Sequence, residues 1–538
     1  MSQSQRAHFD LCIIGCGPGG FAGAMRAIDA GKHVCIVERD EIGGTGVKWG
    51  ALASKTMWEL AKDFAVAAKT DRGYHSQELA VDYGALRETV LQAVKDKQYQ
   101  MLSQIETFSP QCWKGSGSIT LLRGTGRFIS PHRIGVTLES GVQRDIEADY
   151  ILITTGSKPR DLAGIRVDQR RIINSDGVLQ LTQFPRRMMI VGAGVTGCEY
   201  ATIFSNFRQT HVYLVDHQDR VIPFEDDDVS DFVSRNLAHN GVKIFHSAKL
   251  GKVEEKPEHL LATLTFDDGH AQVIEIDTLM LSVGREPCLE SLNLEKAGIA
   301  PDADGYLACD DNCCVGGHIY AAGDVTHRPA LVNMAVMESR YAIKHMFHVK
   351  RWPLTVHNMP TVMFFYPAVA AVGLGEKACQ KRRIPYRAAT YSNALLTRAI
   401  AMRATSGFVK IIISDDAQQK ILGMRAVGPQ VSNTIMSIAL LMDQGKGIND
   451  VLKSMYPHPT MSEGIQECLR LLLGKSIHKP QAFPHHLRVK TWHPRIGYRE
   501  AGIPAMADEG PPDSACINPL PPGHEPSEGV PNQSGSKG

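Results

Sequence analysis

The segment Phe9-Asp-Leu-Cys-Ile-Ile-Gly-Cys-Gly-Pro-Gly-Gly20 determines the fold that we expect for the first part of this chain. A short apolar run of strand type leads directly into a G-x-G-x-x-G turn, and an alanine-rich helical pattern follows as far as Ala30. A second strand pattern, from His33 to Val37, ends on Glu38. A strand, a glycine turn, a helix and a second strand with a terminal acid, in this order, predict a βαβ unit that binds a dinucleotide.

The three glycines of this turn have separate roles in such a unit. Gly15 allows the tight turn, Gly17 lets the backbone approach a pyrophosphate, and Gly20 lets the helix pack closely on the strand. The helix N-terminus presents free N–H groups to phosphate. Glu38 lies eighteen positions after Gly20 and suits a hydrogen bond to a ribose diol. An ordinary strand–helix turn is the alternative interpretation, and the agreement of all the parts favours the nucleotide site.

A second unit of the same kind lies near the middle of the chain. A strand pattern at residues 188–191 leads into Gly192-Ala-Gly-Val-Thr-Gly197, and the strand pattern 211–215 ends on Asp216. Two complete fingerprints in one chain are hard to obtain by chance. Asp216 favours a nucleotide with a free ribose 2′-OH, because a 2′-phosphate would meet like charge. Arg220 leaves NADP(H) possible, although we interpret this arginine as a solvated loop charge.

The other patterns are helical and strand-like segments in alternation. Helical patterns fill residues 56–108, and strand patterns with turns fill 117–155, 242–284 and 318–324. Strands and amphipathic helices follow from about 356 to 474. Basic and aromatic residues alternate in 481–500; we favour an ordinary solvated segment there over a docking strap or a membrane-surface contact. Residues 503–538 are rich in Pro, Gly and Ser, which predicts disorder.

The composition is that of a soluble globular protein with two to four domains. The chain has 538 residues, 43% of them hydrophobic, with 58 Lys and Arg against 57 Asp and Glu. The near-neutral charge argues against nucleic-acid binding, which needs a basic face. We find no signal peptide and no transmembrane segment, since the longest candidate, residues 435–442, is too short. Twelve cysteines in so large a chain do not indicate a disulfide framework, and we expect a cytoplasmic protein.

The order of the motifs resembles the FAD-dependent pyridine nucleotide-disulfide oxidoreductases, which include dihydrolipoamide dehydrogenase and soluble NAD(P) transhydrogenase. The resemblance covers about residues 8–480. The segments most similar to the transhydrogenase are Arg171–Asp176, Gly192–Ala201, Asp219–Phe224 and the Trp49-Gly50 pair. The resemblance implies an α/β fold with two Rossmann-like three-layer nucleotide-binding domains, for FAD and NAD, plus a C-terminal α+β dimerisation domain. It also implies a homodimer.

The implied domains are a discontinuous FAD-binding domain (1–160 and 285–355), an NAD(P)-binding domain (161–284), a dimerisation domain (356–480) and a C-terminal extension (481–538). By resemblance, the FAD contacts are Gly15, Gly17, Gly20, Glu38, Gly44, Thr45, Lys55, Gly126, Thr155, Gly156, Ser157 and Asp324. The nicotinamide-nucleotide contacts are Gly192, Gly194, Gly197, Asp216 and Gly284. No metal ligand is implied.

Two charged pairs are the implied catalytic groups. Lys55 and Glu199 match a pair beside the flavin N5 on the nicotinamide side, where their charges act on the hydride-accepting atom. His458 and Glu463 match the family's acid–base pair, which is contributed across the dimer interface. A carboxylate on one imidazole nitrogen fixes the tautomer and raises the basicity of the ring. A purely structural hydrogen bond is the alternative for this second pair.

Residues 43–55, Gly-Gly-Thr-Gly-Val-Lys-Trp-Gly-Ala-Leu-Ala-Ser-Lys, depart from the family pattern. Gly46 and Ala51 stand where the family carries its two redox-active cysteines, and Ala53 replaces a proline. Without a thiolate there can be no dithiol relay and no mixed disulfide. Other cysteines do not substitute, because they lie in the nucleotide turns or in the cluster that we interpret as ordinary thiols rather than a metal site: Cys16, Cys198, Cys309, Cys313 and Cys314.

These departures leave three hypotheses for function. The first is an FAD enzyme that oxidises NAD(P)H and passes electrons directly to an unidentified acceptor, such as a quinone or a redox protein, where small Gly46 and Ala51 leave room. The second is nicotinamide transhydrogenation at one site. The third is a non-catalytic FAD-binding partner protein, which the retained motifs argue against. Dihydrolipoamide dehydrogenase activity should be absent on chemical grounds.

Overall fold

The computed structural model describes residues 7–73, 79–350, 353–354, 356 and 358–500. The chain divides into two compact units, residues 1–373 with 427–439, and residues 374–426 with 440–538. The expectation of disorder at 503–538 lies outside the described residues. The finer domain boundaries, including the separation of FAD and NAD(P) domains, stay a prediction.

The first sheet of the first unit has parallel strands at its centre. Strand β1 (Ala7–Ile14) pairs in parallel with β2 (His33–Glu38) and with β5 (Gln143–Ile153). Leu11 to Ile14 are buried, which explains why β1 reads as a continuous apolar run. Its first residues, by contrast, are exposed. The sequence pattern therefore missed the start of this strand by two residues.

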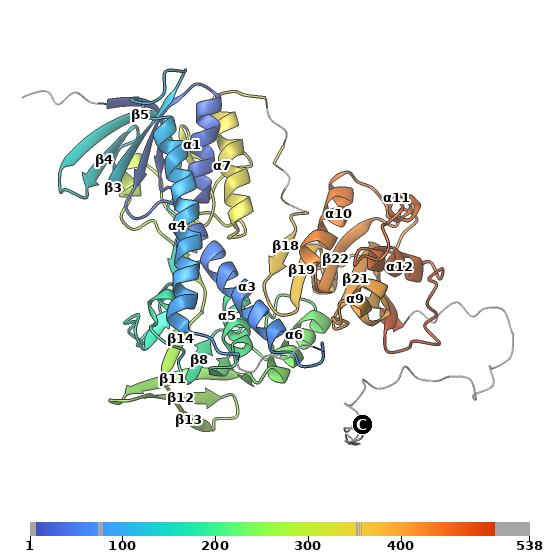
Figure 1. The fold of residues 1–538 in the computed structure, drawn as a ribbon. Coiled ribbons are helices and arrows are strands. Elements are labelled where there is room, and N and C mark those ends of the chain that lie inside the picture. Colours follow the sequence, from blue (N-terminus) through green and yellow to red (C-terminus); the bar gives the residue numbers. More distant parts are fainter. Residues whose placement is uncertain (1–6, 74–78, 351–352, 355, 357, 501–538) are drawn as a thin grey trace, which may run out of the picture. The chain divides into compact units, whose positions relative to one another are not determined.

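Helices cover this sheet and extend from it. Helix α1 (Pro18–Asp29) lies beside α7 (Val332–Met346), and the long α4 (Tyr83–Thr107) runs along the same part of the molecule (Figure 1). The remaining strands of the sheet are β3 (Ser118–Ser130), β4 (Arg133–Leu138), β16 (Cys314–Gly316) and β17 (Ile319–Ala321). Strand β17 pairs in parallel with β5, so that the segment after it reaches the same sheet edge as the first glycine turn.

The second sheet of this unit is parallel throughout, in the order β10-β9-β8-β14-β7. Its strands are β7 (Ile172–Asn174), β8 (Arg187–Val191), β9 (His211–Val215), β10 (Lys243–Phe245) and β14 (Thr278–Leu281). Helices α5 (Val195–Asn206) and α6 (Asp227–His239) connect these strands. A three-stranded antiparallel sheet adjoins in sequence, made of β11 (Ala248–Glu255), β12 (Leu260–Phe266) and β13 (Ala271–Ile276). The predicted strand 211–215 is confirmed at both ends.

Short elements of the first unit complete the surroundings of its glycine turns. They are α2 (Gly44–Lys48), α3 (Ala51–Ala67), β6 (Ser157–Pro159), β15 (Arg285–Pro287), β18 (Thr361–Met363) and β19 (Ala368–Gly373). Strand β15 pairs with β6, which brings Arg285 opposite Pro159 and Pro287 opposite Ser157. Positions far apart in sequence therefore meet at this edge.

The second unit is built on an antiparallel sheet. Strand β20 (Tyr386–Ser392) pairs with β21 (Phe408–Ser414), and helix α12 (Glu463–Leu472) packs on both strands. The unit also contains α8 (Glu376–Lys381), α9 (Thr397–Ala401) and α11 (Ile448–Lys453). Strand β22 (Ile421–Gly428) and helix α10 (Val431–Asp443) span the boundary between the units.

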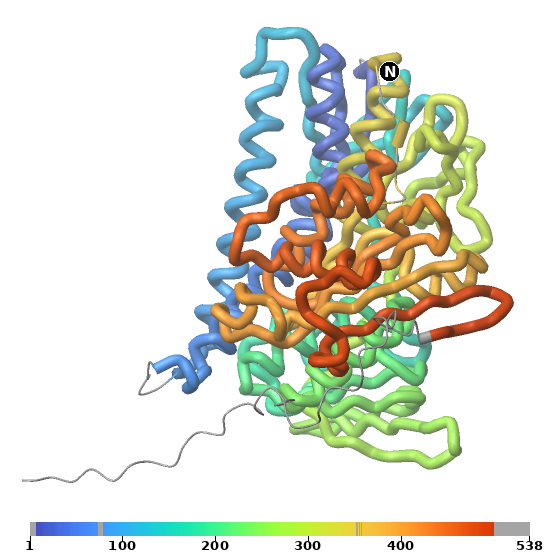
Figure 2. The backbone as a smooth tube through the Cα atoms, turned by 90° about the vertical axis from the view of Figure 1, so that its right-hand side faces the viewer, coloured from blue at the N-terminus to red at the C-terminus, as the bar shows by residue number. Residues whose placement is uncertain are grey.

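Residues 481–500 are not the solvated segment that we favoured. Strand β23 (Leu487–His493) pairs antiparallel with β20, and β24 (Gly497–Glu500) pairs with β23 (Figure 2). The ring of Trp492 stacks on buried Tyr386 with centroids 5.8 Å apart. The alternation of basic and apolar residues is thus the two-residue period of a strand, and the expectation of a solvated segment was wrong.

No helix in the described ranges combines the length and the apolar character that crossing a bilayer requires.

Candidate functional site

A cavity of about 800 Å³ lies in the first unit, where several loops meet at the ends of the strands. Its lining includes the first glycine turn, the acid at the end of β2 and the stretch 44–55. The other lining segments come from later parts of the chain: 124–126, 154–158, 175–176, 195–200, 322–324, 330–335 and 360–364. The fold therefore brings most of the predicted FAD contacts to one cavity, although they span more than 300 positions in sequence.

The first glycine turn has the backbone geometry that was predicted from its sequence. Gly15 has a φ of 100°, and a Cβ there would meet the carbonyl of Thr154. A Cβ at Gly20 would meet the carbonyl oxygen of Gly15, so that helix and turn approach closely. A Cβ at Gly17 meets nothing within 4 Å, because this glycine faces the cavity. Each glycine is required for its own physical reason.

Glu38 is held rigidly at the end of β2. One carboxylate oxygen accepts the backbone N–H of Cys16 at 2.6 Å, and the other accepts the N–H of Asp40 at 2.8 Å. The side chain is buried but still lines the cavity. Each oxygen keeps a second lone pair, so the oriented carboxylate is able to accept hydrogen bonds from a diol.

Another part of the cavity wall is organised by Arg285, which the sequence analysis did not identify. Its Nε donates to Ser157 Oγ at 2.8 Å and its Nη2 donates to the Ser157 carbonyl at 2.7 Å. Ser157 Oγ in turn donates to Asp324 Oδ2 at 2.6 Å. Arg285 also reaches Thr45 Oγ1 at 3.3 Å. The only sequence signal was its position directly after Gly284, at the end of a strand pattern.

Thr155 provides a test of whether the cavity fits a polar ligand. Its hydroxyl oxygen is buried and finds no hydrogen-bond partner among the described residues, yet the residue lines the cavity. An unpaired buried hydroxyl is costly unless a ligand completes it. With open Gly17, oriented Glu38 and the Ser157–Asp324 pair, the cavity has donors and acceptors for a phosphorylated ligand with hydroxyl groups.

Lys55 and Glu199 form the charged pair that the sequence predicted. Lys55 Nζ lies 2.7 Å from Glu199 Oε2, and the backbone N–H of Phe364 donates to Glu199 Oε1 at 2.9 Å. The lysine ammonium also lies over the Phe364 ring, 5.0 Å from its centroid. Lys55 is on α3 and Glu199 is on α5, so that two helices hold the pair at the cavity wall. Glu199 is buried, which strengthens the pairing.

Position 46 is more crowded than we expected. A Cβ on Gly46 would lie 2.5 Å from Cγ of Pro18 and 3.2 Å from Cγ2 of Val332. Only the direction of a side chain on Gly46 is occupied, by the proline at the start of α1. Gly46 and Ala51 both line the cavity, so the room expected there for an acceptor stays a prediction.

The cysteines of the described residues are all free thiols. Burial raises the pKa of Cys16 and of Cys198 well above the ordinary thiol value. Burial also raises the pKa of Cys313 to about 12, although Arg328 Nη1 lies 3.1 Å from its sulfur. These thiols are protonated at neutral pH and are poor nucleophiles.

The second glycine turn repeats the first. Gly192 has a φ of 104°, and a Cβ at Gly197 would meet the Gly192 carbonyl oxygen. Asp216 accepts the N–H of Ala193 and, at 2.8 Å, that of Gln218. The other two predicted contacts, Gly194 and Gly284, are both open around the position of a Cβ.

Arg220 lies in an acidic environment. Its Nη1 is 3.1 Å from carboxylate oxygens of both Asp227 and Asp231. The guanidinium is thus ion-paired with two acids of helix α6 rather than simply solvated.

The predicted acid–base pair lies in the second unit. His458 Nδ1 is 2.8 Å from Glu463 Oε1, and Glu463 Oε2 accepts the N–H of Thr460 at 2.7 Å. Glu463 is the first residue of α12, and the His458 side chain is 63% exposed. The carboxylate holds the imidazole in one orientation and leaves Nε2 accessible.

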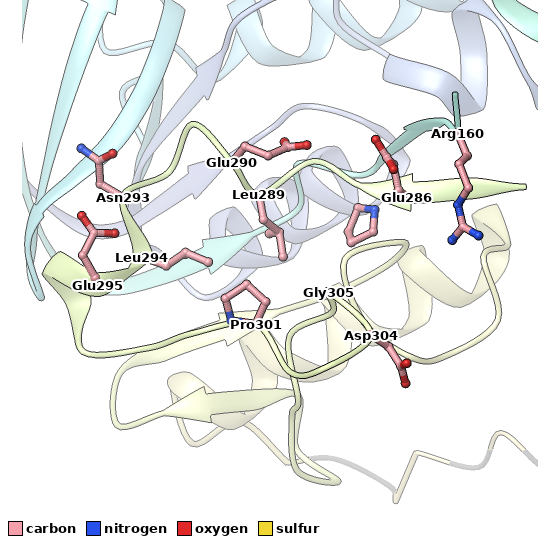
Figure 3. Close-up of a pocket in the computed structure, with 11 residues that line it drawn as sticks. Arg160, Glu286, Leu289, Glu290, Asn293, Leu294, Glu295, Pro301, Asp304 and Gly305 are labelled. Atoms are coloured by element: carbon pink, nitrogen blue, oxygen red, sulfur yellow. The ribbon is translucent and has the colours of Figure 1, made fainter. Parts of the chain in front are cut away.

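A second, shallower cleft of about 620 Å³ lies in the first unit (Figure 3). Its lining includes Glu286 and Glu290, which Lys158 pairs at 3.3 and 2.8 Å. The loop that carries these acids also contributes Cys288 to the wall of the larger cavity. We assign no ligand to this cleft.

The chain was compared with known proteins. Residues 9–339 match Pyridine nucleotide-disulphide oxidoreductase, and residues 359–469 match its dimerisation domain. Dihydrolipoyl dehydrogenase of Chlamydia muridarum is 28% identical over 479 residues, which cover 88% of this chain and 98% of that protein. Mitochondrial dihydrolipoyl dehydrogenase 1 of Arabidopsis thaliana is also 28% identical, over 475 residues covering 87% and 91%.

Solved structures share the fold. LpdA from Mycobacterium tuberculosis is 25% identical, with a TM-score of 0.78 over 87% of this chain and 99% of that chain. The HOCl-induced flavoprotein disulfide reductase RclA from Escherichia coli has a TM-score of 0.75 over 86% and 100%, at 23% identity. The second likeness concerns the fold alone.

Proposed function

Because the chain belongs to the pyridine nucleotide-disulphide oxidoreductase family, we propose that it is an FAD-dependent NAD(P)H oxidoreductase that uses a non-disulfide acceptor. Family membership confirms the resemblance, the α/β fold with a dimerisation domain, and FAD and NAD(H) as the cofactors. What supports the proposal is position 46: Gly46 stands where the resemblance places the family's first redox-active cysteine, and a Cβ there would meet the ring of Pro18.

The cavity residues fit FAD. Gly17 and the N-terminus of α1 would hold the pyrophosphate, Glu38 the adenosine ribose, and the Ser157–Asp324 pair the ribityl chain. Bound FAD would supply the two-electron chemistry that side chains lack. The unpaired Thr155 hydroxyl supports this assignment, because a polar ligand would complete it.

Lys55 and Glu199 would act on the nicotinamide side. Their charges, 2.7 Å apart, form a fixed dipole at the cavity wall, and the Phe364 N–H prevents Glu199 from turning away. Such an arrangement stabilises charge that moves during hydride transfer without rearrangement. The family match implies a homodimer, in which His458 and Glu463 would offer a further proton-transfer group.

Disulfide chemistry is missing from this proposal for a chemical reason. Thiol–disulfide exchange needs a thiolate, and neither Gly46 nor Ala51 carries sulfur. Cys16 and Cys198 are buried with raised pKa values, so they do not replace the lost pair. We therefore expect no dihydrolipoamide dehydrogenase activity, in contrast to the named activity of the curated relatives.

The second nucleotide site favours NADH over NADPH. Asp216 stands where a 2′-phosphate would lie, and like charge would repel it. Arg220 is already paired with Asp227 and Asp231 and offers little attraction in return.

Soluble NAD(P) transhydrogenation is the second candidate function. The Lys55–Glu199 pair on the cavity wall favours it, because the second nucleotide would then use the place that the first nucleotide leaves. The preference of Asp216 for NADH weakens this candidate.

An anaerobic titration tests the main proposal. Purified protein should be yellow, and NADH should reduce it with two electrons per subunit, without a second two-electron step for a disulfide. Reoxidation is then measured with quinones, oxygen and thionicotinamide adenine dinucleotide. Reoxidation by the thionicotinamide nucleotide alone would favour transhydrogenation, and fast reduction by dihydrolipoamide would contradict the proposal.

A further inference from the structure

Asp176 lines the large cavity but has no part in the function proposed so far. It lies at the start of the 3-10 helix η1 (Ser175–Gln180). Its neighbours from Ile172 to Ser175 and from Gly177 to Leu179 are buried, whereas Asp176 keeps part of its surface. Because Asp176 also lines the cavity, this accessible part faces the ligand space.

The carboxyl group is anchored on one side and available on the other. Ser175 Oγ donates to Asp176 Oδ1 at 3.1 Å, and the Asp176 N–H donates to Asn174 Oδ1 at 3.0 Å. Within the described ranges, Oδ2 makes no hydrogen bond to the protein. An anchored acid with one unengaged oxygen in a cavity is suited to contact a ligand.

The surroundings favour the protonated form of this acid. Burial raises the pKa of Asp176, and the charges of Arg285 and Lys48 only partly oppose that effect. Helix α5 adjoins this segment, because its Tyr200 hydroxyl lies 3.4 Å from the Ser175 carbonyl oxygen. The acid Glu199 precedes Tyr200 on the same helix. A larger fraction of Asp176 therefore carries a proton near neutrality than in an exposed aspartate.

We propose that Asp176 is the general acid that protonates a quinone acceptor, an inference that rests on the function proposed above. Reduction of a quinone to a hydroquinone consumes two electrons and two protons. NADH supplies both electrons and one proton as a hydride equivalent. Asp176 supplies the second proton: an O–H bond forms on the quinone oxygen, the O–H bond of the carboxyl group breaks, and the carboxylate then takes a proton from water.

This assignment differs from the one that the sequence suggested. His458 belongs to the second unit and its side chain is largely exposed. Asp176 belongs to the unit that holds the cavity, the Lys55–Glu199 pair and Arg285. Variants of Asp176 and of His458 therefore distinguish which of the two residues is the acid.

The experiment separates the two half-reactions of the full-length, FAD-loaded protein by anaerobic stopped flow. The variants are Asp176→Asn, which keeps the shape but loses the proton, Asp176→Glu, which restores it, and His458→Gln. Asp145→Asn is the matched control, because Asp145 pairs with Arg133 outside the cavity. Flavin content and melting temperature show that each variant is folded. Each reduced protein is mixed with menadione or with ferricyanide, a one-electron acceptor that takes up no proton.

We expect Asp176→Asn to slow oxidation by menadione about 100-fold, the size typical of a lost general acid. Reduction by NADH and oxidation by ferricyanide should stay within about twofold of the wild type, because neither needs this proton. The menadione rate of the wild type should fall as the pH rises and the acid ionises, and the Asp176→Asn rate should not follow pH. Asp176→Glu should recover part of the loss.

Two results would overturn the proposal. If Asp176→Asn slowed oxidation by menadione and by ferricyanide equally, Asp176 would be a binding or structural residue. If the menadione rate were unchanged in Asp176→Asn and lower in His458→Gln, His458 would be the acid instead. A wild-type protein that NADH does not reduce would refute the proposed function, and this inference with it, before any variant is compared.

Discussion

The two glycine turns of the first unit are built alike but are surrounded differently. In both, the first glycine has a strongly positive φ, and the third glycine packs against its carbonyl. In both, the acid at the end of the next strand, Glu38 or Asp216, accepts an N–H from the turn and another from two residues further along. The same backbone arrangement therefore occurs at two turns that share their three glycines and differ in the residues between them.

The two turns differ in the residues that surround them. The helix after the first turn begins with Pro18, whose ring fills the space beside Gly46, whereas Val195 begins the helix after the second turn. The first turn opens into the large cavity, which Asp324 also lines. The second has Arg220 and its two acids nearby. We therefore propose that each fingerprint binds a dinucleotide and that distant residues select which dinucleotide it is.

Substitution of the third glycine should separate the two turns most sharply. A Cβ at Gly20 or Gly197 meets a backbone oxygen that cannot move independently, at a cost of about 3 kcal/mol or more. We expect Gly20→Ala to abolish retention of FAD, measured by the flavin absorbance of the purified protein. Gly197→Ala should stay yellow but lose its response to NADH. If both variants were colourless, the separate tasks of the two turns would be refuted.

Removal of the charge of Glu38 or Asp216 should lower the affinity for the corresponding dinucleotide, by less than the glycine substitutions do. A hydrogen bond to a charged group contributes about 1.5–3 kcal/mol, which corresponds to roughly 10- to 100-fold in affinity. We expect Glu38→Gln to weaken the binding of FAD by this factor and Asp216→Asn to weaken the binding of NADH by the same factor. Asp216→Asn should also narrow the preference for NADH over NADPH. Equilibrium titrations followed by fluorescence measure both, with Asp145→Asn as the control.

The contact between Pro18 and Gly46 makes a prediction about stability. Gly46→Ala should destabilise the protein by about 1–3 kcal/mol, as overpacking of a filled site does. Replacement of Pro18 by alanine in the same chain should recover most of that loss. Urea denaturation of the two single variants and the double variant gives the coupling energy. Simple additivity would mean that the two residues do not compete for space.

The smallest expected effect concerns the cysteines beside the two turns. The pKa values of the Cys16 and Cys198 thiols are raised by burial, so both stay protonated as the pH rises to 8. Iodoacetamide should leave them unmodified in the native protein and should label exposed Cys112. Mass spectrometry of native and urea-unfolded samples measures the difference. Labelling of Cys16 in the native state would show that the first turn opens.

Local sequence predicted the parts of the site that depend on local backbone geometry. The turns Gly15–Gly20 and Gly192–Gly197 and their acids follow from short-range patterns, because glycine conformation and strand periodicity are local properties. Arg285 was not identified from the sequence, because its role depends on the pairing of β15 with β6, which no local pattern reveals. Asp176 was not identified for a similar reason. Only the folded chain shows that its neighbours are buried and that Asp176 itself lines the cavity.

The same limit explains the error at residues 481–500. It also applies at Gly46, where the space for a side chain is set by Pro18, twenty-eight positions earlier in the sequence. Residues 481–500 were interpreted from their charge, although their alternation suited a paired strand as well as a solvated segment. Composition cannot decide between these states without knowledge of the partner strand.

The hairpin of β23 and β24 affects how the protein can be shortened. Strand β23 covers the edge of β20, and Lys490 reaches Glu376 at 3.5 Å beside buried Lys410. A chain that stops at residue 480 would leave unpaired the hydrogen-bonding groups of β20 that face β23, which is a template for association with other copies. A truncation chosen only to match the length of the dimerisation domain, residues 359–469, would therefore produce an aggregating protein.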